Sequence, residues 1–146
     1  MQIYHQVYAG KEKCGTIRWR KNQHVYFVSC NGAKARYVKV TLDKEYLQLA
    51  EVQVFGGSKA VKGLGLLSLN KPTSQSSTGW GGKSSRAVDG NPNGHYGRRT
   101  STHTRKNRNS WWQVNLQKSH PIHLVLVHNR VDCCHNRIDG AKVSII

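Results

Sequence analysis

The stretch Glu51-Val52-Gln53-Val54-Phe55 alternates polar and apolar side chains with the two-residue period of a β-strand that buries one face. A similar alternation follows Arg36 in Tyr37-Val38-Lys39-Val40. Helical periodicity is confined to about one turn near residues 84–88. Strand-like runs dominate the rest of the chain, and we predict strands over residues 15–20, 24–30, 35–42, 49–55, 110–116, 123–130 and 141–146.

Turn signals separate these runs at Asn31-Gly32, Asp89-Gly90 and Asp139-Gly140. Many short strands between turns favour an all-β sandwich or jelly roll. In the run that holds Trp111 and Trp112, neighbouring side chains point to opposite faces, so we expect one tryptophan in the core and the other beneath a loop.

Length and charge limit the possibilities further. A chain of 146 residues is one domain by size and can bury a core. Its formal net charge of +16 favours contact with polyanions. The densest basic stretch holds Arg98, Arg99, Arg105, Lys106 and Arg108. Because no nucleic-acid-binding motif accompanies it, we expect no nucleic-acid partner and keep anionic glycans as the alternative ligand.

The four cysteines are Cys14, Cys30, Cys133 and Cys134, and the sequence alone allows three pairings. Their spacing is not that of a zinc site. An even number of cysteines in a basic, loop-rich domain favours a secreted, oxidising setting. No apolar run is long enough for a membrane-spanning helix.

The most distinctive motif is Arg130-Val131-Asp132-Cys133-Cys134-His135-Asn136-Arg137, preceded by His103. It gathers two guanidiniums, a carboxylate, an imidazole and a cysteine pair, which suit a small polyhydroxylated ligand. It contains no nucleophile–base pair. A glycosidase needs two carboxyl groups flanking the bond, and here Asp132 stands alone beside Arg130, which favours its ionised form. We therefore expect no enzyme.

With that motif, the chain resembles the F-type lectins, a fucose-binding family first known from fish serum. Residues 67–146 resemble the N-terminal half of such a domain and residues 1–55 the C-terminal half, with 56–66 as a linker. The resemblance implies a discoidin-like, galactose-binding-like jelly-roll β-sandwich in circularly permuted order. A circular permutant and a slice through a tandem array, as in bivalve sperm bindins, both explain the inverted order and the end in mid-strand.

The resemblance implies a site for terminal L-fucose on glycans. It assigns the hydrogen bonds to fucose to His103, Arg130 and Arg137, while Asp132 orients an arginine. It also implies a disulfide between Cys133 and Cys134 as an apolar platform for the sugar. Their Cα atoms would be about 3.8 Å apart, below the usual range of roughly 4.4–6.8 Å, so we expect strain.

Two free thiols, or cross-pairing with the other cysteines, are the alternatives to that disulfide. If it forms, Cys14 and Cys30 make the ordinary bridge, contributing about 3 kcal/mol. Tyr96, and less surely Trp80, match loops that line the pocket for the methyl group of fucose.

A structural calcium ion is the second implication. The matching ligands are the side chains of Asp89, Asn91 and Glu51, with the carbonyl oxygens of Arg86, Thr100 and Ala50. A turn cap for Asp89 and a surface position for Glu51 are the plain alternatives. Many members carry cysteines where this chain has Ser101 and Ala50, and their joint absence makes calcium more important for holding the loop. One site per chain would need a homo-oligomer or a tandem-repeat neighbour for multivalent binding.

Overall fold

The computed structural model describes residues 12–57 and 65–146, and in these residues the chain is built of antiparallel strands. Three short 3-10 helices interrupt them: η1 (Ser84–Val88), η2 (Tyr96–Arg98) and η3 (His135–Ile138). The prediction of an all-β chain is confirmed, and so is the helical turn at 84–88, but the expectation that helical structure is confined to that turn is wrong, because η2 and η3 are also present. The strands are β1 (Glu12–Thr16), β2 (Val25–Leu42), β3 (Leu49–Gly56), β4 (Gly65–Leu66), β5 (Thr73–Gln75), β6 (Ser110–Asn129) and β7 (Lys142–Ile145).

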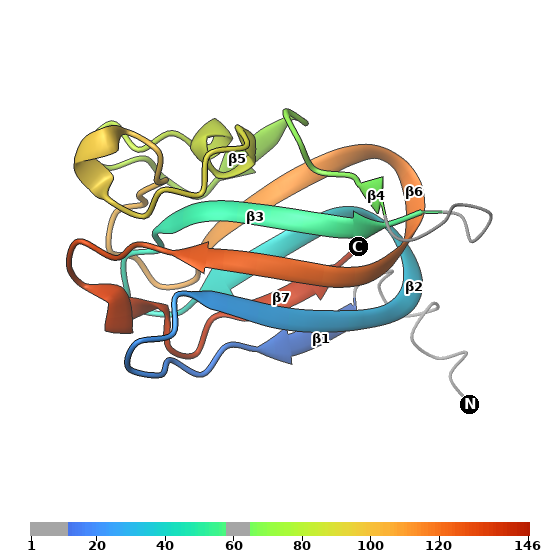
Figure 1. Cartoon of the computed structure of the whole chain (residues 1–146), viewed down its shortest axis with the longest axis horizontal. Helices are drawn as coiled ribbons and strands as arrows, with labels where there is room; N and C mark the ends of the chain where they lie inside the picture. Colours follow the sequence, from blue (N-terminus) through green and yellow to red (C-terminus); the bar gives the residue numbers. More distant parts are fainter. Residues whose placement is uncertain (1–11, 58–64) are drawn as a thin grey trace.

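The sheet has the order β1-β7-β2-β6-β3-β4, and β5 pairs with the first part of β6. Strands β2 and β6 pair along most of their length and curve round together at one end, so that the strands lie in two facing layers (Figure 1). Strand β3 continues the layer that holds the second half of β6, and β7 continues the layer that holds the second half of β2. Strands from before and after residue 57 therefore alternate across the sheet.

The two long strands correct the sequence-based boundaries. The predicted strands 24–30 and 35–42 are one strand, and so are 110–116 and 123–130. Asn31 and Gly32 have the positive φ angles of a turn, 56° and 81°, but the chain continues through them by a register shift between Ser29 and Ala33. Such a bulge bends a strand without ending it.

The beginning of the described chain and its middle also differ from expectation. The first strand covers Glu12–Thr16 instead of 15–20, and β4 and β5 were not predicted. Part of the expected linker belongs to the sheet, because Gly56 pairs with Gly65 and Phe55 with Leu66. Gly56 must be glycine, since a Cβ there would lie 2.0 Å from the carbonyl oxygen of Pro121. Residues 58–64 of the linker lie outside the described residues.

The core lies between the layers and is filled by the alternating inward side chains of the strands. Val40, Val52, Val114 and Val127 have no exposed surface, and neither does Trp112, whose indole Nε1 donates to the Ser84 carbonyl oxygen at 3.0 Å. Its neighbour Trp111 faces outward beneath Lys39, whose Nζ lies 4.9 Å from the ring centroid. One tryptophan is thus in the core as predicted, while the other lies under a lysine of the neighbouring strand β2, not under a loop.

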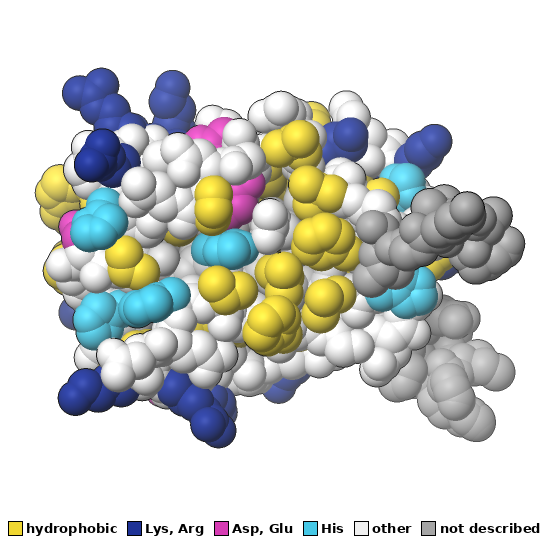
Figure 2. All heavy atoms as spheres, viewed as in Figure 1, with side chains coloured by type: hydrophobic (Ala, Val, Ile, Leu, Met, Phe, Trp, Pro, Cys, Tyr) yellow, Lys and Arg dark blue, Asp and Glu magenta, His cyan; other side chains and the backbone are white. Residues whose placement is uncertain are grey.

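The outer surface is divided between apolar and basic areas. On the face in Figure 2, apolar side chains gather over the front strands, and Lys and Arg lie mainly around the rim. Phe27 of β2 is the most open of the large apolar side chains described, with 68% of its surface exposed. No helix in the described part of the chain is both long and apolar enough to cross a membrane.

Three connections meet at one end of the sheet, opposite the bend of β2 and β6 (Figure 1). They are the loop from β2 to β3, the long connection from β5 to β6, and the loop that follows β6 and contains η3. All residues of the sequence motif and its upstream histidine lie on the second and third of these connections.

Candidate functional site

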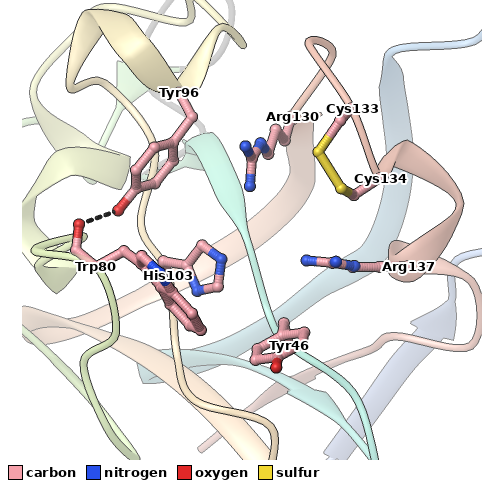
Figure 3. Close-up of a pocket in the computed structure, with 8 residues that line it drawn as sticks. All are labelled: Tyr46, Trp80, Tyr96, His103, Arg130, Cys133, Cys134 and Arg137. Carbon is pink, nitrogen blue, oxygen red and sulfur yellow. Dashed lines mark hydrogen bonds between the residues drawn. A yellow bond between two sulfur atoms is a disulfide. The ribbon is translucent and has the colours of Figure 1, made fainter.

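A hollow of about 260 Å³ lies at this end of the molecule, and we call it the pocket. Its volume is below the roughly 300–1,000 Å³ typical of sites for drug-sized ligands, so it suits a small ligand such as one sugar ring. Figure 3 shows the guanidiniums, the imidazole and the disulfide around one space. The lining residues are Tyr46, Trp80, Tyr96, His103, Arg130, Cys133, Cys134 and Arg137.

Arg130 is held by a bidentate ion pair with Asp132. Its Nε and Nη2 donate to the two carboxylate oxygens at 2.8 and 3.1 Å. The backbone N–H of Tyr96 also donates to Asp132, at 3.1 Å. Chiefly because of the hydrogen bond from Arg130, the pKa of Asp132 falls to about 2, so the carboxylate is ionised at neutral pH. Asp132 therefore orients the guanidinium that faces the pocket and does not itself line it.

Beneath the pocket lies Gln48, a residue that the sequence interpretation did not single out. It is 4% exposed, and one polar atom of its amide faces three nitrogen atoms. With the amide oxygen assigned to that position, it accepts from Arg130 Nη1 at 2.8 Å, Arg137 Nη1 at 2.9 Å and His103 Nε2 at 2.6 Å. The opposite orientation would point an N–H at two guanidinium donors, so we assign the oxygen there. One buried acceptor thus joins the three basic groups.

His103 is 5% exposed, and its Nδ1 lies 2.7 Å from the carbonyl oxygen of Thr104. Burial is the largest influence on the ring and lowers its pKa below the usual value, and Arg130 and Arg137 lower it further. The Thr104 carbonyl opposes this shift, as does the Gln48 oxygen by its position. Burial and the two cations thus lower the pKa in spite of these two acceptors. In its neutral form the ring has a single N–H and donates to only one of them.

Aromatic rings form the walls around the histidine. The rings of Trp80, Tyr46 and Tyr96 lie 4.6, 5.3 and 5.5 Å from that of His103, between centroids. The guanidinium of Arg137 lies 4.7 Å from the Tyr46 ring, and that of Arg130 lies 4.7 Å from the Tyr96 ring. Such contacts hold the arginines by cation–π attraction while leaving other N–H groups for a ligand.

Trp80 is placed by its backbone. Its φ of 49° is rare for a bulky residue, and its carbonyl oxygen accepts from the Tyr96 hydroxyl at 2.5 Å, as Figure 3 shows. The side chain is 67% exposed although it is large and apolar. Strained conformations tend to persist where function requires them. Sequence reasoning named Trp80 as a weak candidate and missed Tyr46.

Both disulfides have the pairing that the resemblance implies. Cys133 and Cys134 are bonded to each other, with Cα atoms 3.7 Å apart, and their bridge lines the pocket. Cys14 and Cys30 join β1 to β2. No cysteine among the described residues is left free.

A second polar centre, which we call the acidic corner, consists of Glu51 on β3 and Asp89 after η1. Glu51 is 2% exposed, and its Oε2 accepts from the Gly90 N–H at 2.8 Å. Its Oε1 is buried and has no hydrogen-bond partner among the described residues. Burial, and less strongly the neighbouring Asp89, raise the pKa of Glu51 to about 8. Two carboxyl groups, one with an unpartnered oxygen, fit a hard cation such as calcium.

The other residues expected at a calcium site lie nearby in the chain. Asp89 Oδ1 accepts from the Asn91 N–H at 2.9 Å, and Thr100 donates its hydroxyl hydrogen to the Asn93 carbonyl oxygen. The Arg86 guanidinium donates to the carbonyl oxygen of Ser101 at 3.2 Å, and Ala50 is buried beside Glu51. Within residues 12–57 and 65–146, no three His, Cys, Asp or Glu side chains cluster, so a cation would also need amide and backbone oxygens.

The chain was compared with known proteins. Residues 86–146 match the model of the family described as NedA-like, galactose-binding domain. Over 61 residues the chain is 41% identical to Fucolectin-6 and 43% identical to Fucolectin-3, both of Anguilla japonica, covering 42% of this chain and 33% of each relative. Fucolectin of Anguilla anguilla is 38% identical over 63 residues, which are 43% of this chain and 40% of that protein. No solved structure matches significantly.

The chain spans about a third of the length of these relatives. The matched residues contain Tyr96, His103 and the whole Arg130–Arg137 motif, and thus most of the pocket. Tyr46 and Gln48 come from outside them. Residues 86–146 are therefore similar to the NedA-like, galactose-binding domain, and a stretch of about the same length is similar to part of the fucolectins.

Proposed function

We propose that the pocket binds terminal L-fucose on glycans, without catalysis. The observation that carries this proposal is the meeting of Arg130, Arg137 and His103 around one small hollow. The free N–H groups of the two guanidiniums are strong, fixed donors for the ring oxygen and hydroxyls of a sugar, while His103 lines the pocket with its two ring nitrogens turned to Gln48 and Thr104. The names and sequences of the fucolectins support fucose as the sugar.

Each remaining lining group has a role in this proposal. Asp132 orients Arg130 and offsets part of the positive charge. The bridge between Cys133 and Cys134 offers a compact apolar surface to one face of the ring, and Tyr96 packs against the methyl group together with Trp80. Tyr46 closes the side of the pocket next to Arg137.

We further propose that calcium binds at the acidic corner. Glu51, Asp89 and Asn91 would supply side-chain oxygens, and Arg86, Thr100 and Ala50 backbone oxygens. A calcium ion would neutralise the two carboxylates and fix the connection that leads from Asp89 to His103. The unpartnered Glu51 oxygen supports this assignment.

The disulfides and the fucolectin relatives also support a proposal for where the protein acts. The two disulfides and the fucolectin relatives are consistent with an extracellular protein, and we propose a secreted lectin of cell or gamete recognition. Multivalent binding would come from a homo-oligomer or a tandem-repeat neighbour. The circular permutation and the division at residues 56–66 remain proposals from the resemblance.

Calorimetric titration of L-fucose into the oxidised protein tests the proposal. We expect binding in calcium that changes little between low and high salt, because the sugar is neutral, and that weakens under excess chelator. His103→Ala should abolish it, whereas His24→Ala, at an exposed histidine outside the pocket, should not. L-galactose, which differs by one hydroxyl on the methyl carbon, should bind more weakly. Equal binding of D-galactose, or no heat with folded protein, would contradict the proposal.

A further inference from the structure

A second hollow of about 430 Å³ lies directly beside the pocket, and we call it the side hollow. Tyr46 and Trp80 line both spaces and form the wall between them. The Tyr46 ring contacts a cation of each, with the Arg137 guanidinium 4.7 Å and the Lys106 Nζ 5.9 Å from its centroid. A glycan whose terminal sugar fills the pocket can extend across Trp80 into the side hollow. Its other lining residues are Thr78, Gly79, Arg105 and Lys106.

The side hollow carries two positive charges without a paired acid. Within the described part of the chain, the ion pair of Arg130 with Asp132 is the only salt bridge, so Arg105 and Lys106 make none. Glu45 is near in the fold, through its bridge to Asn107, but its carboxylate accepts from the Tyr46 backbone N–H at 2.9 Å instead. Both cations are exposed and available to a ligand.

The backbone that carries these cations is held in place. The Arg105 N–H donates to Ser77 Oγ at 2.9 Å, and that hydroxyl donates to Asn107 Oδ1 at 3.1 Å. On the same segment, the Gly79 N–H donates to the carbonyl oxygen of His103 at 2.8 Å. The backbone at Arg105 is therefore tied to the segment that contacts His103, beside the pocket.

The hollow on the other side of the pocket has a different balance of charge. A third hollow there is lined by Asn93, His95, Gly97, Arg98 and Asp132, so its arginine shares the space with a carboxylate. Of these neighbouring hollows, the one with uncompensated cations is the side hollow. A guanidinium and an ammonium group close together suit an oxyanion, because both form charge-assisted hydrogen bonds with it.

We propose that the side hollow binds an oxyanion on the same glycan whose terminal fucose occupies the pocket. The chain would then prefer fucosylated glycans that carry a sulfate ester or a sialic acid carboxylate on a neighbouring sugar. This inference rests on the proposed function, because fucose places the rest of the glycan over Trp80.

Calorimetry with four ligands tests the proposal: L-fucose, a neutral fucosylated trisaccharide, and the same trisaccharide with a sulfate ester or with a sialic acid. We expect the better anionic ligand to bind roughly three- to tenfold more tightly than the neutral one at low salt, and the gain to shrink at high salt. The sulfated and sialylated ligands compared with each other identify which oxyanion fits.

The double variant Arg105→Gln/Lys106→Gln should lose this gain while its Kd for L-fucose stays within about twofold. Lys34→Gln/Lys118→Gln removes the same charge near the bend of β2 and β6, at the opposite end of the molecule, and should keep the gain. A gain that survives in the first variant, or is lost equally in the second, overturns the proposal.

The two proposals fail in different ways. A wild-type chain that does not bind L-fucose contradicts the proposed function and the two-part site with it. A chain that binds L-fucose but gains nothing from sulfate or carboxylate contradicts the oxyanion site alone. A sulfated galactoside without fucose that binds as tightly as the fucosylated one would show a general polyanion surface and overturn the two-part site.

Discussion

The pocket and the acidic corner both bring together groups that would carry like charges, and they reduce that repulsion in different ways. In the pocket, Arg130, Arg137 and His103 share the Gln48 amide as acceptor, and Asp132 adds a full negative charge. In the acidic corner, Glu51 and Asp89 lie together and one buried Glu51 oxygen has no described partner. The pocket therefore holds its cations with acceptors of the protein, whereas Glu51, with a pKa raised to about 8, is protonated at neutral pH unless the cation that we propose binds there.

The largest effect should come from removing the acceptor under the pocket. Gln48→Leu leaves three donors, the buried His103 and the part-buried Arg130 and Arg137, without their shared partner, and we expect unfolding free energy to fall by about 3 kcal/mol. The affinity for L-fucose should fall by roughly 100-fold, because the guanidiniums lose their common orientation. Denaturant unfolding and calorimetry measure the two effects.

Two variants control this experiment. Gln48→Glu keeps an acceptor in the same place and should retain most of the stability. Gln53→Leu makes the same chemical change on β3, at a half-buried residue that contacts His128, and should leave fucose binding unchanged. Wild-type stability and affinity in Gln48→Leu would show that the pocket does not depend on an internal acceptor.

The calcium ion that we propose at the acidic corner should have the next largest effect. At a concentration 100-fold above its Kd, an ion that binds only the folded state adds about 2.7 kcal/mol, or roughly 5–10 °C in Tm for a chain of this size. Glu51→Gln should abolish that increase. Asp132→Asn, the equivalent change in the pocket, should leave it intact. Equal loss in both variants would mean that the two centres are not independent.

Lowering the pH should reduce the unfolding free energy of the chain through protonation of His103. Its pKa is lowered in the folded state, so the unfolded chain takes up the proton first and stability is lost as pH falls below about 6.5. We expect a lower unfolding free energy at pH 5.5 than at pH 7.5 in saturating calcium, and a smaller loss in His103→Gln. His128, whose pKa burial also lowers, contributes separately, and His128→Gln should leave fucose binding unchanged. Identical pH dependence in wild type and His103→Gln would contradict a lowered pKa of His103.

The pocket shows which parts of a site a sequence reveals. The Arg130–Arg137 motif was recognisable because its groups are contiguous, so their spacing survives any rearrangement of the chain. Gln48 and Tyr46 come from a different connection and have no such pattern. Between Leu47 and Leu49, a glutamine resembles the solvent-facing position of an alternating strand, yet it is 4% exposed. Only the tertiary contact with Arg130 and Arg137 identifies its role.

The fold shows the same limit at Asn31 and Gly32. Asn31 and Gly32 do have positive φ angles, which are common in turns, but the prediction that a turn separates two strands there was wrong. A turn signal fixes the conformation of its own residues, but whether the strand resumes depends on pairing partners such as Ile122 and Pro121 of β6. Strand β5 was missed because its three residues, Thr73–Gln75, lack an apolar pattern and pair only through β6.

The last prediction concerns Trp80, in the wall between the pocket and the side hollow. Replacing it should change stability least of all, so that its effect on binding can be measured apart from any effect on folding. Trp80→Asn places a residue that tolerates positive φ where an exposed tryptophan is strained. Relief of strain offsets the lost ring contacts, so unfolding free energy should change by less than about 0.5 kcal/mol. Fucose affinity should nevertheless fall roughly three- to tenfold, because the ring beside His103 is gone.

Trp111→Asn is the matched control, and we expect the opposite result from it: lower stability with unchanged binding. Trp111 lies on β6, outside the pocket and beneath Lys39, and asparagine is a poor strand residue. This variant should lose about 1 kcal/mol of stability and bind fucose normally. If Trp80→Asn instead destabilises the chain as much as Trp111→Asn, then Trp80 holds the fold together. Its exposed position beside the pocket would then be a consequence of packing, and the wall would have no separate part in recognising the sugar.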